Sequence, residues 1–144
     1  MASDSRGHDD YIGTVKLQKL FKKQIKRKEY VFGLAGFWEA GLLFMDWFES
    51  RDSALMTRLE KLSGETDFSV LIWDGKKLLH ADPFMRITPV NEEYYAAGSG
   101  ACYAITALDC GKSAAQAVQM AIKRDPNSGG RIVTMRLEPK VKSP

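Results

Sequence analysis

The sequence predicts an α+β fold in which helices cover sheets, and three observations support this prediction. The 144-residue chain is 44% hydrophobic, enough to bury a core at the usual length of one domain. Apolar residues repeat at strand-like spacing in some segments and at helical spacing in others. The segments follow the order ββ, α, ββ(β), αα, β, which is not a βαβ alternation. We therefore expect a single layered domain over residues 1–144, with a loosely ordered tail from about residue 138.

The first predicted strands flank a basic run. Residues 15–21 favour one strand, and residues 30–36 favour another that is apolar on both faces, as in a buried strand. Residues 16–28 include seven basic residues and no acidic one. A solvated hairpin explains these cations better than a nucleic-acid site, which would also need interleaved aromatic residues and a recognisable module.

Helical spacing begins at residue 37. Aromatic and aliphatic side chains repeat every three or four positions over residues 37–62, and the polar sequence Glu-Ser-Arg-Asp-Ser at residues 49–53 predicts a break near Ser50. We expect the apolar stripe to pack in the core. Two apolar runs at residues 68–73 and 76–80 then flank Asp74-Gly75, which is a strong hairpin signal.

The second half of the chain combines short extended segments with two helices. Gly111 and the capping box Ser113-Ala114-Ala115-Gln116 mark the end of one helix and the start of the next. A turn cluster at residues 125–130 precedes an alternating strand. The expected elements are extended structure at 85–89, a strand end at 95–97, helices at 101–108 and from 114, and a strand at 132–137.

The cysteines and histidines do not form a recognisable site. Cys102 and Cys110 lie eight residues apart in a predicted helix, which is about 12 Å of rise and beyond the reach of a disulfide. We expect two reduced, buried thiols in a reducing, cytoplasmic compartment. His8 and His80 have no partner at metal-ligand spacing, so neither a metal nor a cofactor is expected. The longest apolar run, residues 41–45, is too short for a membrane span, and no secretory signal precedes it.

Six segments, in order, resemble the β-type subunits of the proteasome and the bacterial ATP-dependent proteasome-like peptidases. None of these motifs is specific alone, but together they extend from Ala2 to Gly130. They are Ala2-Ser3-Asp4-Ser5-Arg6 (A-x-D-S-R), Lys19-Leu20-Phe21-Lys22 (K-[IV]-F-K), Ala35-Gly36 before the first long helix, Ala97-Gly98-Ser99-Gly100 with Tyr103-Ala104 (G-S-G-x-x-Y-A), residues 113–125 (S-A-x-x-A-V-x-x-A-x-x-x-D), and residues 125–130 (D-x-x-S-G-G). The resemblance implies an N-terminal-nucleophile (Ntn) hydrolase with a four-layer αββα sandwich.

The same resemblance implies roles for individual residues. In this family an N-terminal threonine supplies the hydroxyl nucleophile, and its α-amine, which titrates near neutrality, is the base. Lys19 would be the active-site lysine, Asp4 the aspartate that orients it, and the Gly36 amide the oxyanion hole. Lys16 is the alternative lysine, because Thr14-Val15-Lys16 also resembles a family stretch. Polar support around the amine and the nucleophile would come from Ser99, Asp125 and Ser128. Without the resemblance, the residues themselves favour structural roles: Asp4 as a turn cap, Lys19 as a surface cation, and Ser99 and Ser128 as loop or helix-cap hydroxyls.

The nucleophile departs from the family pattern. The family threonine precedes A-x-D-S-R by one strand hairpin, roughly a dozen residues, whereas three residues precede Asp4 here and none is a threonine. Three interpretations stay open: a misassigned start with a threonine-led strand upstream, a non-catalytic proteasome-like subunit, or an unrelated function on a shared fold. The absence of the first strand predicts an exposed sheet edge in residues 1–144.

The resemblance also implies an activity and partners. The family activity is threonine-type endopeptidase hydrolysis of peptide bonds, and we expect residues 1–144 as they stand not to perform it. The implied partners are further copies of the chain in a ring, a peptide or protein substrate if the protein is active, and an ATPase. The alternative is a structural protein that assembles into a ring without hydrolase activity. No membrane partner is expected, and the net charge of +3 is too small to indicate nucleic acid.

Overall fold

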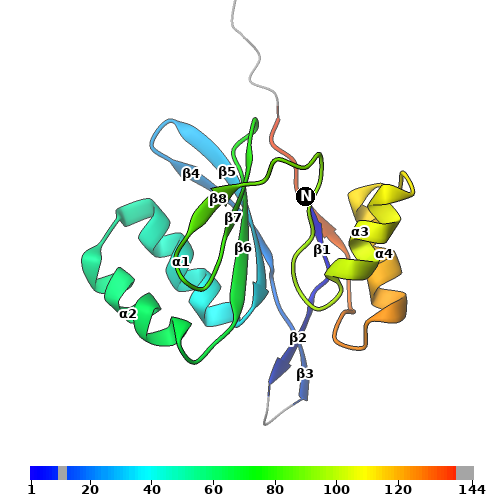
Figure 1. The fold of residues 1–144 in the computed structure, drawn as a ribbon, viewed down its shortest axis with the longest axis horizontal. Helices are drawn as coiled ribbons and strands as arrows, with labels where there is room; N and C mark the ends of the chain where they lie inside the picture. The colour runs from blue at the N-terminus through cyan, green and yellow to red at the C-terminus, as the bar shows by residue number, and fades with distance from the viewer. Residues whose placement is uncertain (10–12, 139–144) are drawn as a thin grey trace, which may run out of the picture.

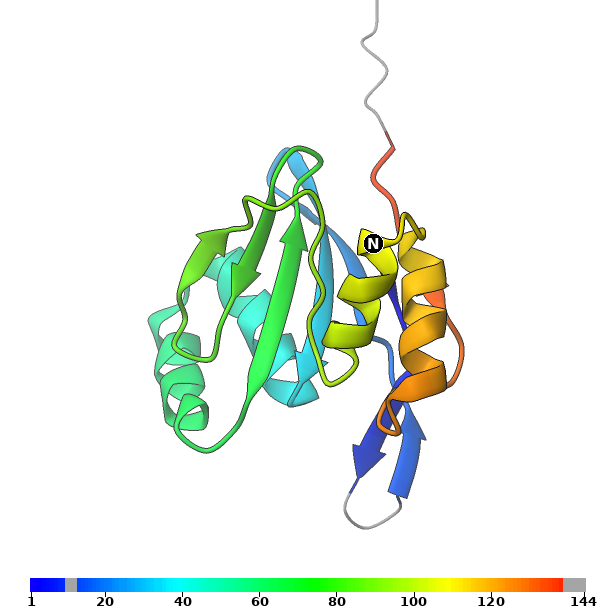
Figure 2. The same ribbon diagram turned by 45° about the vertical axis from the view of Figure 1, so that its right-hand side comes forward.

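The computed structural model describes residues 1–9 and 13–138, and its elements form four layers (Figures 1 and 2). The helices are α1 (Trp38–Ser50), α2 (Ser53–Ser63), α3 (Ala101–Asp109) and α4 (Ala114–Arg124). α1 and α2 cover one face of a five-stranded sheet, and the other face of this sheet points toward a two-stranded sheet backed by α3 and α4. This αββα order confirms the predicted fold class. The tail expected to be loosely ordered lies, from residue 139 on, outside the described residues.

All strand pairs in the described residues are antiparallel. The strands are β1 (Ala2–Ser3), β2 (Arg6–Asp9), β3 (Gly13–Lys16), β4 (Leu20–Ile25), β5 (Lys28–Gly36), β6 (Phe68–Trp73), β7 (Leu78–Ala81), β8 (Ile87–Pro89) and β9 (Val133–Thr134). β4 to β8 form the five-stranded sheet in chain order, and β2 pairs with β3. β1 pairs with β9, so the two ends of the described chain meet in one small sheet.

The main core lies between α1, α2 and the five-stranded sheet. Phe32, Phe44 and Phe68 are at most 1% exposed, and each such ring contributes roughly 1.5–3 kcal/mol of burial free energy. Phe48 meets Phe32 edge to face, with ring centroids 5.5 Å apart. The aromatic stripe of residues 37–62 is therefore core, as predicted.

The predicted break near Ser50 separates α1 from α2. Arg51 adopts a left-handed conformation with φ 58°, and its amide donates to the Trp47 carbonyl. The Asp52 carboxylate then caps α2 by accepting the Ala54 amide at 2.8 Å. The apolar pattern of residues 37–62 therefore forms two helices, α1 and α2, that pack against each other. The hairpin at Asp74-Gly75 is also confirmed, since β6 and β7 flank it.

The single strand expected at residues 15–21 is wrong. β3 ends at Lys16 and β4 begins at Leu20. The interruption falls where the chain changes its pairing partner. The Leu17 amide still donates to the Ser5 carbonyl, next to the β2–β3 pairs, whereas the Lys19 carbonyl accepts the Leu34 amide, next to the β4–β5 pairs. One run with strand propensity is therefore divided between two sheets.

Expectations for the second half of the chain are mostly confirmed, with three corrections. Residues 95–97 form no strand, because no described strand pairs with them. β9 is shorter than the strand expected at 132–137. Cys102 and Cys110 are free but exposed rather than buried, because α3 buries its alanine face instead. No helix in residues 1–9 and 13–138 is long and apolar enough to cross a bilayer.

Candidate active site

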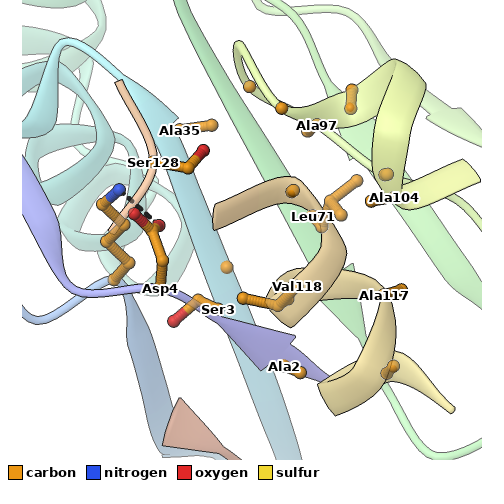
Figure 3. Close-up of a pocket in the computed structure, with 18 of the residues that line it drawn as sticks. Ala2, Ser3, Asp4, Ala35, Leu71, Ala97, Ala104, Ala117, Val118 and Ser128 are labelled. Carbon is orange, nitrogen blue, oxygen red and sulfur yellow. Dashed lines mark hydrogen bonds and ion pairs between the residues drawn. The ribbon is translucent and has the colours of Figure 1, made fainter. Parts of the chain in front are cut away.

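A cavity of about 200 Å³ separates the five-stranded sheet from the layer formed by β1, α3 and α4 (Figure 3). Most of the site residues expected from the sequence lie on its wall. Those that line it are Asp4, Lys19, Gly36, Ser99 and Ser128. Asp125 does not line the cavity, but it lies directly behind two of these residues through hydrogen bonds. The six residues come from two separate stretches of the chain, residues 4–36 and 99–128, so only the tertiary fold brings them together.

Lys19 and Asp4 form an ion pair at the cavity wall. The Lys19 Nζ lies 2.6 Å from Asp4 Oδ1, and the two side chains are 20% and 12% exposed. The other oxygen, Asp4 Oδ2, accepts the Gly129 amide at 2.8 Å. The carboxylate is thus held from two sides and fixes the position of the ammonium. Lys16 is instead exposed on β3, opposite Arg6, so the structure places Lys19, and not Lys16, beside Asp4.

The segment after β1 is anchored by contacts that the sequence analysis did not single out. Ser5 is 4% exposed, its amide donates to the Gly129 carbonyl, and its Oγ accepts the Arg131 amide at 2.8 Å. Gly130 has φ 75°, and a Cβ there would lie 2.6 Å from the Ser5 Oγ, so glycine is required. The sequence did contain a signal for these contacts. Ser5 follows Asp4 in the A-x-D-S-R motif, and Gly129 follows Ser128 in the D-x-x-S-G-G motif.

Asp125 forms a buried polar cluster with Ser99 and Ser128. It is the C-cap of α4 and is 5% exposed. Its Oδ2 accepts both serine hydroxyls at 2.6 Å, and its Oδ1 accepts the Asn127 amide at 3.1 Å. Burial alone would raise the pKa of this carboxyl, but these hydrogen bonds, together with the nearby Lys19 charge, lower it below its ordinary value. Asp125 is therefore an ionised carboxylate, and among the described residues none forms an ion pair with it.

Gly36 ends β5 at the cavity wall. Its φ is 80°, and a Cβ at this position would lie 2.4 Å from the Asp67 carbonyl oxygen. Both the left-handed backbone and the close approach exclude a side chain. The glycine therefore has a clear structural reason here, and its role as an oxyanion donor stays a prediction.

The α-amine of residues 1–144 lies away from this cluster. The Met1 amine donates to the Met135 carbonyl at 2.8 Å, and the Met135 amide donates back to the Met1 carbonyl. Burial, followed by the charge of Arg136, lowers the pKa of this amine. Asp4 is three residues further along the strand, about 10 Å at the rise of extended chain. The amine of Met1 is therefore not placed to act as a base beside Lys19.

The hydroxyl groups at the cavity are already engaged or lack a partner. Ser99 and Ser128 both donate to Asp125. The Ser3 Oγ is buried, and the structure gives it no hydrogen-bond partner. None of these three hydroxyls contacts Lys19 Nζ in the described residues. The cavity thus carries charge and orienting groups without an activated hydroxyl.

A serine–histidine contact lies on the five-stranded sheet, and the sequence analysis missed it. The Ser69 Oγ is 2.6 Å from His80 Nε2, and the Tyr95 ring packs against the imidazole at 5.4 Å. The two residues are brought together by the β6–β7 register rather than by sequence spacing. Neither lines the cavity, so this pair is not part of the site. No group of three or more His, Cys, Asp or Glu side chains in the described residues could hold a metal.

Comparison with known proteins identifies the fold. No protein-family model matches the sequence, and no curated protein matches it significantly. Solved structures do match, among them HslV from Trypanosoma brucei (18% identity, TM-score 0.68, covering 92% of this chain and 88% of that one). BPH from Thiobacillus denitrificans, solved with epoxomicin, matches at 18% identity and TM-score 0.69, with 96% and 92% coverage. Anbu from Hyphomicrobium sp. strain MC1 matches at 13% identity and TM-score 0.67, with 91% and 73% coverage.

Proposed function

Because this chain has the proteasome β-type Ntn hydrolase fold, we propose that its cavity is a threonine-type peptidase site. In this proposal residues 1–144 carry the charged and orienting groups. The observation that supports it is the meeting of two polar clusters at one cavity, the Lys19–Asp4 ion pair and Asp125 with its two serines.

Each group has a distinct role in such a reaction. The Lys19 ammonium, held by Asp4, favours the deprotonated form of a hydroxyl placed beside it. The Asp125 carboxylate, through Ser99 and Ser128, orients a protonated amine at the same place. The Gly36 amide would donate to the developing oxyanion. These interactions are strong because the cavity is partly shielded from water, which lowers the effective dielectric constant.

Among residues 1–9 and 13–138, no hydroxyl or amine is placed as a nucleophile at this point. The Met1 amine is bonded to β9, and the serine hydroxyls nearest the site donate to Asp125. We therefore expect the 144-residue chain to hydrolyse short fluorogenic peptides no faster than its Lys19→Ala variant. Hydrolysis by the unmodified chain that disappears in Lys19→Ala would contradict this expectation.

The N-terminal residue of the protein isolated from its natural source tests the proposal directly. Intact mass and terminal sequencing would give this residue. A mature N-terminal threonine, serine or cysteine together with peptidase activity would support the proposal. A terminus at Met1 or Ala2 together with an inactive protein would favour the second candidate.

The second candidate is a non-catalytic subunit that assembles with further copies into a ring. The observation that favours it is that the Ser99 and Ser128 hydroxyls at the cavity both donate to Asp125, and no hydroxyl among the described residues is bonded to the Lys19 ammonium. In both candidates the partners are other copies of the chain, and in the first an ATPase and a peptide or protein substrate as well. Native mass spectrometry combined with the peptide assay distinguishes them: a ring without activity supports the second.

A further inference from the structure

The contact between Ser69 and His80 lies on the face of the five-stranded sheet that points away from α1 and α2. Val70 and Ala81 pack in the core under these helices, so their neighbours Ser69 and His80 point to the opposite face. The two side chains are diagonal neighbours on β6 and β7, since His80 pairs directly with Leu71. The hydrogen bond between them is therefore on the side of the sheet that faces the cavity.

Three residues that contact or pair with Ser69 and His80 line the cavity. Ala35 pairs with Ser69 across the β5–β6 ladder, and Leu71 pairs with His80 across the β6–β7 ladder. The Tyr95 ring packs against the imidazole, with ring centroids 5.4 Å apart. All three lie on the cavity wall, where Figure 3 shows Ala35 and Leu71. The serine and the histidine thus lie directly beside the cavity, although neither lines it.

The hydrogen-bond network assigns the proton between the two side chains. The Ser69 Oγ and the His80 Nε2 are 2.6 Å apart, and within residues 1–9 and 13–138 neither side chain has a second hydrogen-bond partner. The other ring nitrogen, Nδ1, is not a buried atom without a partner, so water reaches it. A proton on Nδ1 then bonds to water, and the Ser69 hydroxyl donates to Nε2. The opposite tautomer would leave the hydroxyl hydrogen without a protein acceptor.

This arrangement gives Ser69 a general base. The distance of 2.6 Å lies within the range of about 2.6–3.2 Å in which a base takes a proton from a hydroxyl. The cavity hydroxyls of Ser99 and Ser128 differ, because they donate to the Asp125 carboxylate, whose pKa is held below its ordinary value. Such a carboxylate is a weaker proton acceptor than a neutral imidazole. Ser69 is therefore better prepared for nucleophilic attack than either of these serines.

We propose that Ser69 and His80 form a second acyl-transfer site, which acts on activated esters of short apolar acids. The apolar side chains of Ala35 and Leu71 provide the surface for the acyl group on the cavity wall. No carboxylate among the described residues bonds to the second ring nitrogen of His80, so the site suits esters with good leaving groups rather than amides. This inference goes beyond the proposed peptidase function and does not depend on it.

The reaction balances without a cofactor. The Ser69 Oγ attacks the ester carbonyl carbon while His80 Nε2 takes the hydroxyl proton. The ester C–O bond breaks, the leaving group departs as an alcohol with the proton from His80, and the acyl group stays on Ser69. Water then attacks this acyl group and gives one proton to His80, which returns it to the serine oxygen. The products are the carboxylic acid and the free Ser69 hydroxyl.

Two reagents test this site on the 144-residue chain. A rhodamine-tagged fluorophosphonate reacts with activated serines, since the serine oxygen attacks phosphorus and fluoride leaves. Peptide mapping by mass spectrometry locates the label, and hydrolysis of p-nitrophenyl butyrate measures turnover. We expect the label on Ser69, and we expect Ser69→Ala to remove both the label and the turnover. Ser63, an exposed serine that donates to the Glu60 carbonyl, is the internal control and should stay unlabelled.

Two variants separate the chemistry from a merely structural hydrogen bond. His80→Gln keeps a hydrogen-bonding side chain beside Ser69 but removes the base, so the labelling rate should fall at least about 100-fold while the thermal unfolding midpoint changes little. Leu71→Trp adds bulk between the cavity and His80, and it should raise the KM for p-nitrophenyl butyrate more than it lowers kcat. Gln119→Trp, on the exposed face of α4, is the matched control and should leave both values unchanged.

Several outcomes would overturn the proposal. These are a folded chain in which Ser69 takes no label, a labelling rate that His80→Gln leaves unchanged, and ester hydrolysis that persists in Ser69→Ala. Ester hydrolysis with the same KM in Leu71→Trp would contradict the place assigned to the acyl group. None of these results bears on the proposed peptidase function, because that function uses Lys19 and Asp4 and not the Ser69 hydroxyl.

Discussion

Replacing Asp125 by alanine removes the buried carboxylate that holds Ser99 and Ser128 behind the cavity. The carboxylate accepts two hydroxyls at 2.6 Å and one amide at 3.1 Å. Because it is 5% exposed, water cannot replace these bonds without opening the end of α4. We therefore expect the substitution to destabilise the fold as well as the site.

The magnitude follows from these three bonds. A hydrogen bond to a charged group contributes about 1.5–3 kcal/mol, but such values are not additive and the buried carboxylate itself costs desolvation. We estimate a loss of about 2–4 kcal/mol for Asp125→Ala. Asp125→Asn keeps the shape and one acceptor oxygen, so its loss should be smaller, about 1–2 kcal/mol.

Urea unfolding followed by tryptophan fluorescence measures these losses, and its pH dependence checks their cause. The pKa of Asp125 is lower in the folded state than its ordinary value of 3.8. Its contribution to the free energy of unfolding is therefore complete above about pH 4 and is lost as pH falls through the lower, folded-state pKa. The stability difference between the unmodified chain and Asp125→Asn should be constant from pH 5 to 7 and shrink below about pH 4.

Asp109→Asn is the matched control, because Asp109 also ends a helix and accepts a hydroxyl, that of Tyr94, but is exposed. It should change the free energy of unfolding by less than about 0.5 kcal/mol. A loss below about 1 kcal/mol for Asp125→Ala, or equal losses for Asp125→Ala and Asp125→Asn, would show that the buried cluster is not held as we argue.

Two further substitutions test other parts of the fold. Gly36→Ala should destabilise the protein by about 2–4 kcal/mol, measured by thermal unfolding. The reason is that Gly36 has a φ of 80° and that the new Cβ would clash with the Asp67 carbonyl. A loss below about 1 kcal/mol would contradict this strain argument. Burial would raise the pKa of Asp74, but hydrogen bonds from Lys28 and two backbone amides outweigh it and lower the pKa from 3.8 to about 2. Its contribution to stability is thus present above about pH 4 and lost toward pH 2, and is worth about 1–2 kcal/mol after screening. Asp74→Asn should remove this contribution in urea unfolding at pH 7. Lys28→Met, which removes an exposed partner, should cost less than Asp74→Asn. An equal or larger loss for Lys28→Met would mean that the ion pair, and not the turn, carries the contribution.

Local patterns were sufficient for the elements with strong periodicity or distinctive turn residues. The helix break near Ser50, the hairpin at Asp74-Gly75 and the capping box at Ser113 all appear in the structure where the sequence predicts them. Each of these features depends on residues only a few positions apart, so the local sequence is enough to predict it. The same patterns failed at residues 15–21 and 95–97, where distant contacts or the absence of a pairing strand decide the conformation.

The residue types of the candidate site were also predictable, but only because six ordered motifs resemble a known family. Composition and spacing alone could not choose between Lys16 and Lys19, which lie three positions apart in one basic run. The choice depends on Asp4, and Asp4 is positioned by the Gly129 amide from the other end of the chain. The exposure of the cysteines escaped prediction for a similar reason, since it depends on which face of α3 packs inward.

By their pattern, the residues of the sequence determined an α+β fold with helices covering sheets and most of its helices and hairpins. The resemblance to a known family added the four-layer αββα order and the set of polar residues that could form the site. Only the tertiary structure decided that Lys19 pairs with Asp4, that Asp125 lies behind Ser99 and Ser128, and that these two clusters meet at one cavity. The physical reason is the range of the interactions. Turns and caps depend on residues a few positions apart. Lys19 and Asp4 are 15 positions apart, Asp125 and Ser99 are 26 apart, and the Gly129 amide that holds Asp4 is 125 positions away. The geometry of these contacts exists only once the layers have packed.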